Sequence, residues 1–174
     1  MYRRFIWLLL LLAALLLLGG CRYLPGDGKA PQPSSKPPEP PPEPSSPLIT
    51  LYFSESASYF KRVQGYEFRA EDGKYTAYFY MANEDEPYPV PVDQAWVDTL
   101  GGFIHQYGMM AWDGFSGSAP GLLDGTQFDA AFTFADGTAV HASGYGRFPE
   151  GYGEASEAID THFMQLLPQE MRDW

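Results

Sequence analysis

The chain has 174 residues, 16% of them aromatic, and its 22 acidic against 11 basic residues give a formal net charge of −11. Such a charge repels phosphate polymers, so nucleic acid and anionic lipid headgroups are poor partners, and no nucleic-acid partner is predicted. A basic patch near the start of the predicted domain departs from this rule, and it consists of Lys61, Arg62, Arg69 and Lys74. Cys21 is the only cysteine, so no disulfide can form within the chain.

The N-terminus has the order of a cleaved lipoprotein signal. Arg3 and Arg4 precede the apolar run from Phe5 to Leu18, whose 14 residues are too few for a bilayer, which takes roughly 20. Leu18-Gly19-Gly20-Cys21 resembles a bacterial lipobox. The resemblance implies that residues 1–20 are removed and that Cys21 carries a diacylglycerol thioether. The mature chain would then lie outside the cytoplasm, attached to the membrane through this lipid.

The lipid is followed by a proline-rich spacer in residues 21–47. Pro25 to Pro47 holds ten prolines, and most of its other residues are Ser, Glu, Lys or Gly. This composition favours extended polyproline II, which at about 3.1 Å per residue reaches up to roughly 70 Å. Residues 48–174 then predict a single folded domain.

The first part of this domain predicts strands. Leu48 to Ser54, Tyr59 to Glu71 and Lys74 to Ala82 are rich in β-branched and aromatic residues. Asp72-Gly73 between the last two is a hairpin signal, so the three strands should form a meander.

From Val92 the apolar period changes to that of a helix. The recurring apolar residues are Val92, Trp96, Leu100, Phe103, Ile104 and Tyr107. Asp93 is placed to cap the start and Gly108 to end it. Gly101-Gly102 lowers helix propensity by roughly 1 kcal/mol each, which predicts a bend or a break there.

A second hairpin and a final helix follow. Phe128 to Phe134 alternates apolar and other residues, and Thr138 to Ser143 is its partner strand. A two-residue turn would place Phe132 opposite His141, whereas a three-residue turn with Gly137 as a bulge places Phe132 opposite Val140. The second keeps the apolar face whole and is preferred.

The final helix is predicted from about Gly153 to Leu167, with Pro168 as its stop. It should bury Ala155, Ile159, Phe163 and Leu166. The predicted fold is therefore α+β, an antiparallel sheet in the order β-β-β-α-β-β-α with two helices packed on one face.

Five short motifs between Leu100 and Phe163 carry a family resemblance. They are Trp112-Asp113-Gly114-Phe115, Leu123-Asp124-Gly125, Phe134-Ala135-Asp136-Gly137, Ala142-Ser143-Gly144-Tyr145 and Phe148-Pro149. As an ordered set they resemble small lipoproteins of Gram-positive bacteria whose domains have no assigned activity. The resemblance implies an exported α+β domain and no particular reaction.

Residues able to support catalysis are few. His105, His141 and His162 show no close spacing typical of a metal or general-base site, so neither a metal nor a cofactor is predicted. Asp113, Asp124 and Asp136 each precede glycine, which is typical of turns and is also compatible with an acidic cluster for glycan hydrolysis.

Aromatic residues offer a candidate recognition surface. Trp112 and Phe115 lie in the irregular stretch Tyr107 to Leu123, and either plug the core or present an aromatic loop. Tyr78 and Tyr80 share one strand face, and either stack against a sugar or pack under a helix. The sequence thus predicts a non-catalytic binding or structural module of the envelope, with an envelope protein or glycan as partner; the alternative is a glycan-directed hydrolase using Asp carboxylates.

Overall fold

A computed structural model describes residues 46–56 and 63–172, which fall in one compact unit. The elements are β1 (Leu48–Ser56), β2 (Val63–Glu71), β3 (Lys74–Met81), β4 (Tyr88–Val92), α2 (Gln94–Gln106), the 3₁₀ turn η1 (Met109–Trp112), β5 (Ser116–Ser118), β6 (Gln127–Phe134), β7 (Ala139–Tyr145), α3 (Tyr152–Met164) and α4 (Gln169–Arg172). The predicted signal peptide, Cys21 and nearly all of the spacer lie outside the described residues.

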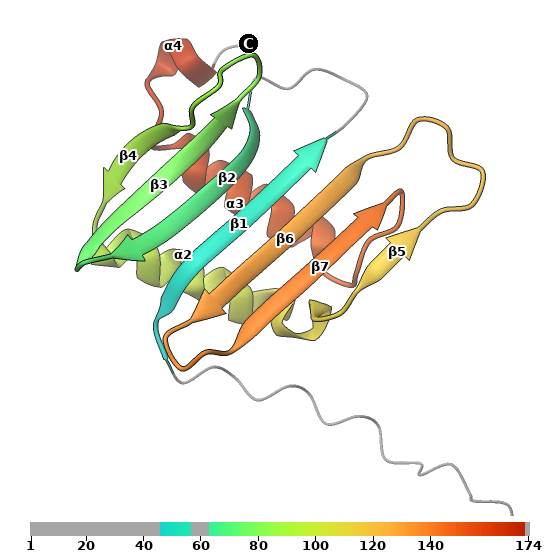
Figure 1. Ribbon diagram of the computed structural model, residues 1–174, viewed down its shortest axis with the longest axis horizontal. Coiled ribbons are helices and arrows are strands. Elements are labelled where there is room, and N and C mark those ends of the chain that lie inside the picture. Colours follow the sequence, from blue (N-terminus) through green and yellow to red (C-terminus); the bar gives the residue numbers. More distant parts are fainter. Residues whose placement is uncertain (1–45, 57–62, 173–174) are drawn as a thin grey trace, which may run out of the picture. The chain divides into compact units, whose positions relative to one another are not determined.

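The seven strands form one sheet in the order β4-β3-β2-β1-β6-β7-β5 (Figure 1). All neighbours are antiparallel except β5, which pairs with β7 in parallel. Glu71 pairs with Lys74, and Asp72 and Gly73 between them have φ of 51° and 73°. These values are typical of the two-residue turn that matches strand twist. The predicted meander of the first three strands is confirmed.

The hairpin of β6 and β7 has the predicted three-residue register. Phe132 lies opposite Val140, and Gly137 adopts a φ of 88°, which a side chain would disfavour. Phe128, Ala130, Phe132 and Phe134 are buried in alternation along β6. His141 is exposed, as this register requires.

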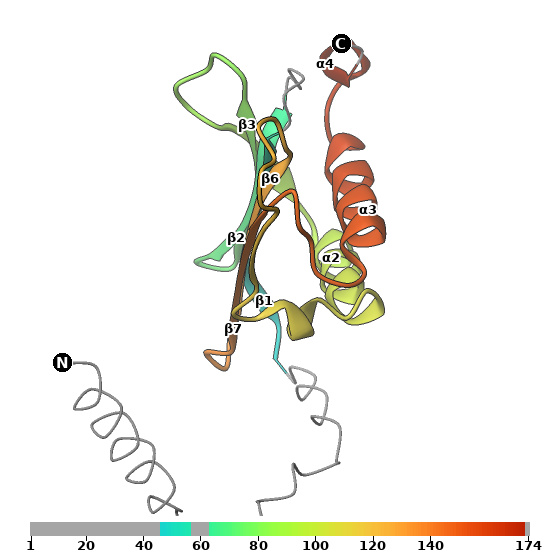
Figure 2. The ribbon, with the colours of Figure 1, turned by 90° about the vertical axis from the view of Figure 1, so that its right-hand side faces the viewer.

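Helices α2 and α3 lie on the same face of the sheet (Figure 2). Asp93 caps α2 by accepting a hydrogen bond from the Trp96 amide at 2.9 Å, and Gly108 takes the left-handed conformation after its end. The predicted break does not occur, because α2 runs through Gly101 and Gly102 and keeps Leu100 and Ile104 buried on one side. The burial of this apolar stripe outweighs the low helix propensity of the glycines.

Helix α3 buries Tyr152, Ala155, Ile159 and Phe163. The predicted burial of Leu166 is wrong, since Leu167 is 1% exposed and Leu166 is only half-buried. The helix ends at Met164, and beyond Gln165 the amides bond to carbonyls three residues back, Leu166 to Phe163 and Leu167 to Met164. This tighter winding turns Leu167 toward the sheet.

The α+β class and the mostly antiparallel sheet are therefore confirmed, while the element order differs from the predicted one. The prediction lacks two strands. In β4, Pro89 and Pro91 interrupt the residue pattern of a strand, and β5 has only three residues, which pair with β7. Among the described residues, no helix has both the length and the apolar character needed to cross a membrane.

Candidate recognition surface on the open face of the sheet

The face of the sheet opposite α2 and α3 carries no helix among the described residues (Figure 2). Side chains alternate along each strand, so Ala77 and Phe79 of β3 are buried while Tyr78 and Tyr80 point to this open face. Tyr52 of the central strand β1 joins them and is 36% exposed. The alternative that Tyr78 and Tyr80 pack under a helix is therefore wrong.

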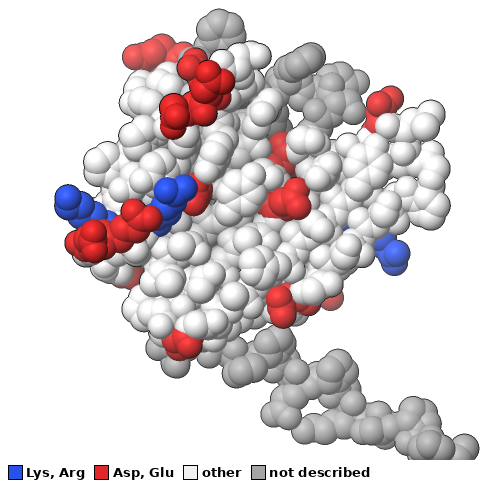
Figure 3. Space-filling model, in the orientation of Figure 1, with Lys and Arg blue, Asp and Glu red and all other residues white. Residues whose placement is uncertain are grey.

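Figure 3 shows charged side chains around the margins of the open face and a few toward its middle. The charged groups that this face carries include the Glu67–Arg69 pair and Asp129, and the tyrosine side chains beside them are uncharged.

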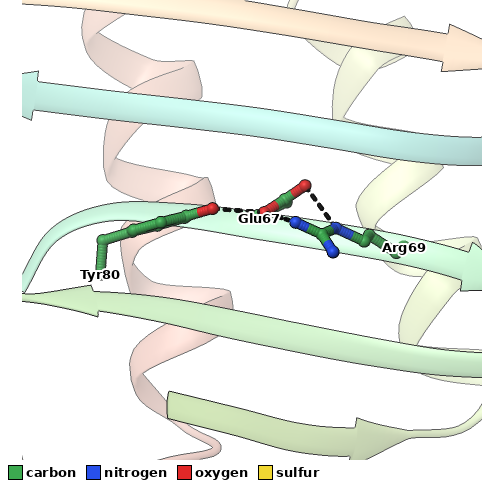
Figure 4. A network of polar contacts seen from close by, with 3 residues as sticks. All are labelled: Glu67, Arg69 and Tyr80. Atoms are coloured by element: carbon green, nitrogen blue, oxygen red, sulfur yellow. Dashed lines mark hydrogen bonds and ion pairs between the residues drawn. The ribbon is translucent and has the colours of Figure 1, made fainter. Parts of the chain in front are cut away.

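A polar network occupies one half of this face (Figure 4). Glu67 accepts hydrogen bonds from Arg69 Nε at 2.6 Å, from Arg69 Nη2 at 2.8 Å and from the Tyr80 hydroxyl at 2.5 Å. Burial would raise the pKa of Glu67, but these hydrogen bonds outweigh it and hold that pKa below its usual range. The same carboxylate raises the pKa of Tyr80 and of Arg69. Of the predicted basic patch, Lys61 and Arg62 lie outside the described residues. Arg69 is already paired with Glu67.

The network also contacts Tyr78 and Tyr80, the two tyrosines that the sequence analysis identified. The Arg69 guanidinium lies 4.8 Å from the centre of the Tyr78 ring, and the Tyr80 hydroxyl is bound to Glu67. Tyr52 meets Tyr80 edge to face, with ring centres 5.9 Å apart. Tyr52 thus connects the network to the other half of the face, where Phe115 is the candidate recognition residue that sequence reasoning identified.

That other half contains a hollow of about 390 Å³. Its lining residues are Tyr52, Gly114, Phe115, Ser116, Asp129, Ala130, Ala131, His141, Ala142 and Ser143. In the cross-strand row Tyr52–Ala131–His141, the small side chain of Ala131 separates two large ones. The next row, Asp129–Ser143–Ser116, brings a carboxylate and two hydroxyls beside it.

The aromatic loop is divided between core and surface. Trp112 is 1% exposed and its indole nitrogen donates to the Glu150 carbonyl at 2.9 Å, so its assignment to a recognition surface is wrong. Phe115 is half-buried, packs on Phe128 and lines the hollow. Trp112 therefore belongs to the core, as the first alternative has it. Phe115 packs against the core on one side and lines the hollow on the other.

The three histidines lie apart. His105 is exposed on α2, His141 is on the open face, and His162 of α3 packs against Trp96 on the helical side. Among residues 46–56 and 63–172, no three His, Cys, Asp or Glu side chains are placed to hold a metal ion.

The three aspartates lie in separate turns and loops. Asp113 accepts from the His141 amide, and Asp136 accepts from the Thr138 amide in the β6–β7 turn. This turn hydrogen bond lowers the pKa of Asp136. Asp124 follows Leu123, whose carbonyl accepts from the Tyr145 hydroxyl at the other end of β7. The acidic cluster that the hydrolase alternative requires is not formed by these residues.

Two carboxylates that sequence reasoning missed meet tyrosines where β1 and β2 face α3. Tyr66 donates to Asp160 at 2.6 Å and Tyr152 donates to Glu55 at 3.0 Å, beside a hollow of about 260 Å³. Burial, and then the adjacent carboxylates, raise the pKa of both tyrosines well above its usual value. Each pair joins residues more than 90 positions apart, so no local pattern could predict it. These contacts fasten α3 to the sheet.

No protein-family model matches this chain, and no curated protein matches it in sequence. Because a fold alone does not define an activity, the inference of function rests on the chemistry of the open face.

Proposed function

We propose that this protein is a membrane-anchored extracytoplasmic lipoprotein that holds an envelope partner on the open face of its sheet. In this proposal residues 1–20 are the signal peptide, residues 21–47 are the lipidated Cys21 and its spacer, and residues 48–174 are the binding domain. The resemblance of residues 18–21 to a lipobox, and of the later motifs to small lipoproteins of Gram-positive bacteria, supports the location. The protein is not expected to bind nucleic acid or to need a cofactor.

One observation carries the binding role: the sheet face that bears Tyr52, Tyr78 and Tyr80 in a strongly acidic chain is covered by no helix of residues 46–56 and 63–172 (Figure 2). Tyrosine is enriched in recognition surfaces because its ring supplies contact area and its hydroxyl supplies a hydrogen bond. A structural or binding role is favoured over catalysis, because the candidate histidines and aspartates do not converge. The aspartate-based hydrolase is therefore not proposed.

The spacer gives the binding face its reach. If residues 25–47 adopt polyproline II, the domain can work up to roughly 70 Å from the membrane surface. Lipid anchoring also confines many copies to one plane, so a weak interaction of each copy sums to strong attachment to an extended partner.

The test is photo-crosslinking from defined positions of the full-length chain in a bacterial host that processes lipoproteins. A photoreactive phenylalanine replaces Tyr78 on the open face in one variant and the exposed His105 on α2 in another. We expect an envelope component to be captured from position 78 and not from position 105. Equal capture from both positions, or none from position 78, would contradict binding through the open face.

The anchor is tested in the same cells by incorporation of labelled fatty acid. Cys21→Ser should abolish the label, leave residues 1–20 attached and reduce capture from position 78. Labelling that persists in Cys21→Ser would contradict the lipoprotein assignment independently of the crosslinking result.

A further inference from the structure

We infer that the partner held on the open face is a neutral carbohydrate chain, and that the hollow beside Tyr52 is its main binding subsite. This inference rests on the proposed function, because it assigns a chemical class to the partner of the same surface. Three features of the hollow support it: its shape, its hydrogen-bonding groups and its charge.

The shape suits a sugar ring. Ala131 lies between Tyr52 and His141 in one cross-strand row, so the surface sinks where its short side chain replaces a long one. The resulting hollow of about 390 Å³ lies at the lower end of the roughly 300–1,000 Å³ that ligand sites in proteins occupy. A pyranose ring presents C–H groups on its faces, and these pack by dispersion on an aromatic ring such as that of Tyr52.

The polar groups suit the sugar's edge. Asp129, Ser143 and Ser116 lie side by side on β6, β7 and β5, next to His141. A carboxylate accepts several hydrogen bonds, a serine hydroxyl both donates and accepts, and an imidazole can do either. Asp129 accepts from Gln127 Nε2 at 3.2 Å through Oδ2, which orients the carboxylate on the open face. Neighbouring sugar hydroxyls need this mixture of donors and acceptors.

The charge selects a neutral glycan. Asp129 places a carboxylate in the hollow, and the whole chain carries −11, so a glycan of uronic acids would be repelled. Arg69, the basic side chain near the centre of the face, is already bound twice by Glu67. It therefore offers little to an anionic ligand.

A glycan also fits better than a protein partner. A stable protein interface needs about 800 Å² per partner around a continuous apolar core. The open face instead alternates tyrosines with Thr50, Thr76 and Thr133, with the serines of the hollow and with the Glu67–Arg69 pair. As far as the described residues show, this surface has many hydroxyl groups and no large aliphatic patch, and such a surface can form the hydrogen bonds that a chain of sugars offers.

The test uses the lipidated protein, residues 21–174, in detergent and immobilised oligosaccharides of matched length. The neutral probes are oligomers of glucose, mannose, galactose and N-acetylglucosamine, and the anionic probes are oligomers of galacturonic acid. We expect at least one neutral series to bind, and the anionic series to bind at least about tenfold more weakly, a difference of about 1.4 kcal/mol.

Two pairs of variants locate the subsite. Ala131→Leu fills the hollow and should reduce binding at least about tenfold, whereas Ala139→Leu makes the same change on the same face outside the hollow and should not. Tyr52→Ala should likewise reduce binding, whereas Tyr52→Phe keeps the ring and should bind within about threefold of the parent, since the stacking term is retained. Thermal unfolding of each variant verifies that it is folded.

The outcomes separate the two proposals. If no neutral oligosaccharide binds while position 78 still captures a protein, the glycan assignment is overturned and the binding role stands. If position 78 captures nothing and no oligosaccharide binds, both proposals fail. Glycan binding that survives Ala131→Leu in a folded protein overturns the assignment of the subsite.

Discussion

Trp112 fastens the irregular segment after α2 to the start of α3. Its indole nitrogen donates to the Glu150 carbonyl, and its ring packs near Phe128 and Tyr152 with centres 6.5 and 5.9 Å away. A buried indole usually finds such a partner, because an unpaired N–H in the core is costly. The residue therefore contributes to stability rather than to recognition.

We expect Trp112→Ala to lower the free energy of unfolding by about 3–5 kcal/mol, through lost burial and the cavity left behind. Trp112→Phe should cost less, about 1–3 kcal/mol, because it keeps a ring but leaves the Glu150 carbonyl without its donor. Urea unfolding of the full chain measures both. An unchanged midpoint for Trp112→Ala would mean that the side chain is not in the core.

Tyr52 shows what sequence reasoning misses at the scale of single residues. Its strand is predicted, and so is the tyrosine pair of β3, but its neighbours Glu67 and Ala131 come from strands on either side of β1. Which strand adjoins which depends on the sheet order, and local periodicity carries no information about that order. The tyrosine face could thus be predicted, whereas the hollow could not.

Helices α2 and α3 meet through an aromatic contact. The rings of Trp96 and His162 stack with centres 4.4 Å apart, and His162 Nε2 lies 3.0 Å from the Trp96 carbonyl oxygen. Burial lowers the pKa of His162, although the hydrogen bond to that carbonyl partly opposes the shift. Glu154 and Glu157 line the adjoining hollow from exposed positions. Burial between the two helices therefore favours the neutral form of the His162 imidazole.

This contact predicts a pH dependence of stability. The unfolded histidine takes up a proton near pH 6.5, while the folded one resists until a lower pH. The contribution of His162 to the free energy of unfolding is therefore fully present above about pH 6.5. It falls as the pH drops toward the folded pKa, by at most about 1.4 kcal/mol per pH unit for one proton.

His162→Phe keeps a ring against Trp96 and should flatten this part of the curve, as measured by urea unfolding between about pH 7 and 5. The same substitution at the exposed His105 is the control and should leave the slope as it is. A slope unchanged in His162→Phe would mean that other groups dominate the acid sensitivity.

At the scale of elements, the strongly periodic segments are predictable and the short ones are not. The β6–β7 hairpin could be predicted down to its register, because only one turn length keeps Phe132 and Val140 on the same buried face. Strand β5 has no such pattern, since three residues become a strand only by pairing with β7. Strand β4 could not be predicted, because its two prolines interrupt the residue pattern of a strand.

For the whole molecule, those prolines govern how the sheet ends. Pro89 and Pro91 lack an amide hydrogen, so the pairing of β4 with β3 must use the amides of the residues between and beside them. The outward edge of β4 therefore offers no N–H at either position. A blocked edge of this kind prevents strands of other copies from adding to the sheet.

We expect the double variant Pro89→Val with Pro91→Val to self-associate, because it restores two donors to an edge of high β-propensity. Light scattering over time in detergent, at a temperature just below unfolding, should show a several-fold faster rise than in the parent. Pro120→Val, in an exposed loop, is the matched control. Equal rates in all three proteins would contradict a protective role for the prolines.

The central place of β1 has a consequence for how the chain folds if it is exported as proposed. Leu51 pairs on one side with Phe68, which follows closely, and on the other with Phe132, which is made only after α2 and β5. In the proposed export from the N-terminus, the local meander can form at once, but one edge of β1 stays open until β6 has emerged. Between those two events the unpaired backbone groups of that edge would face the surroundings, which is when the exported chain would be open to misassembly and to proteases.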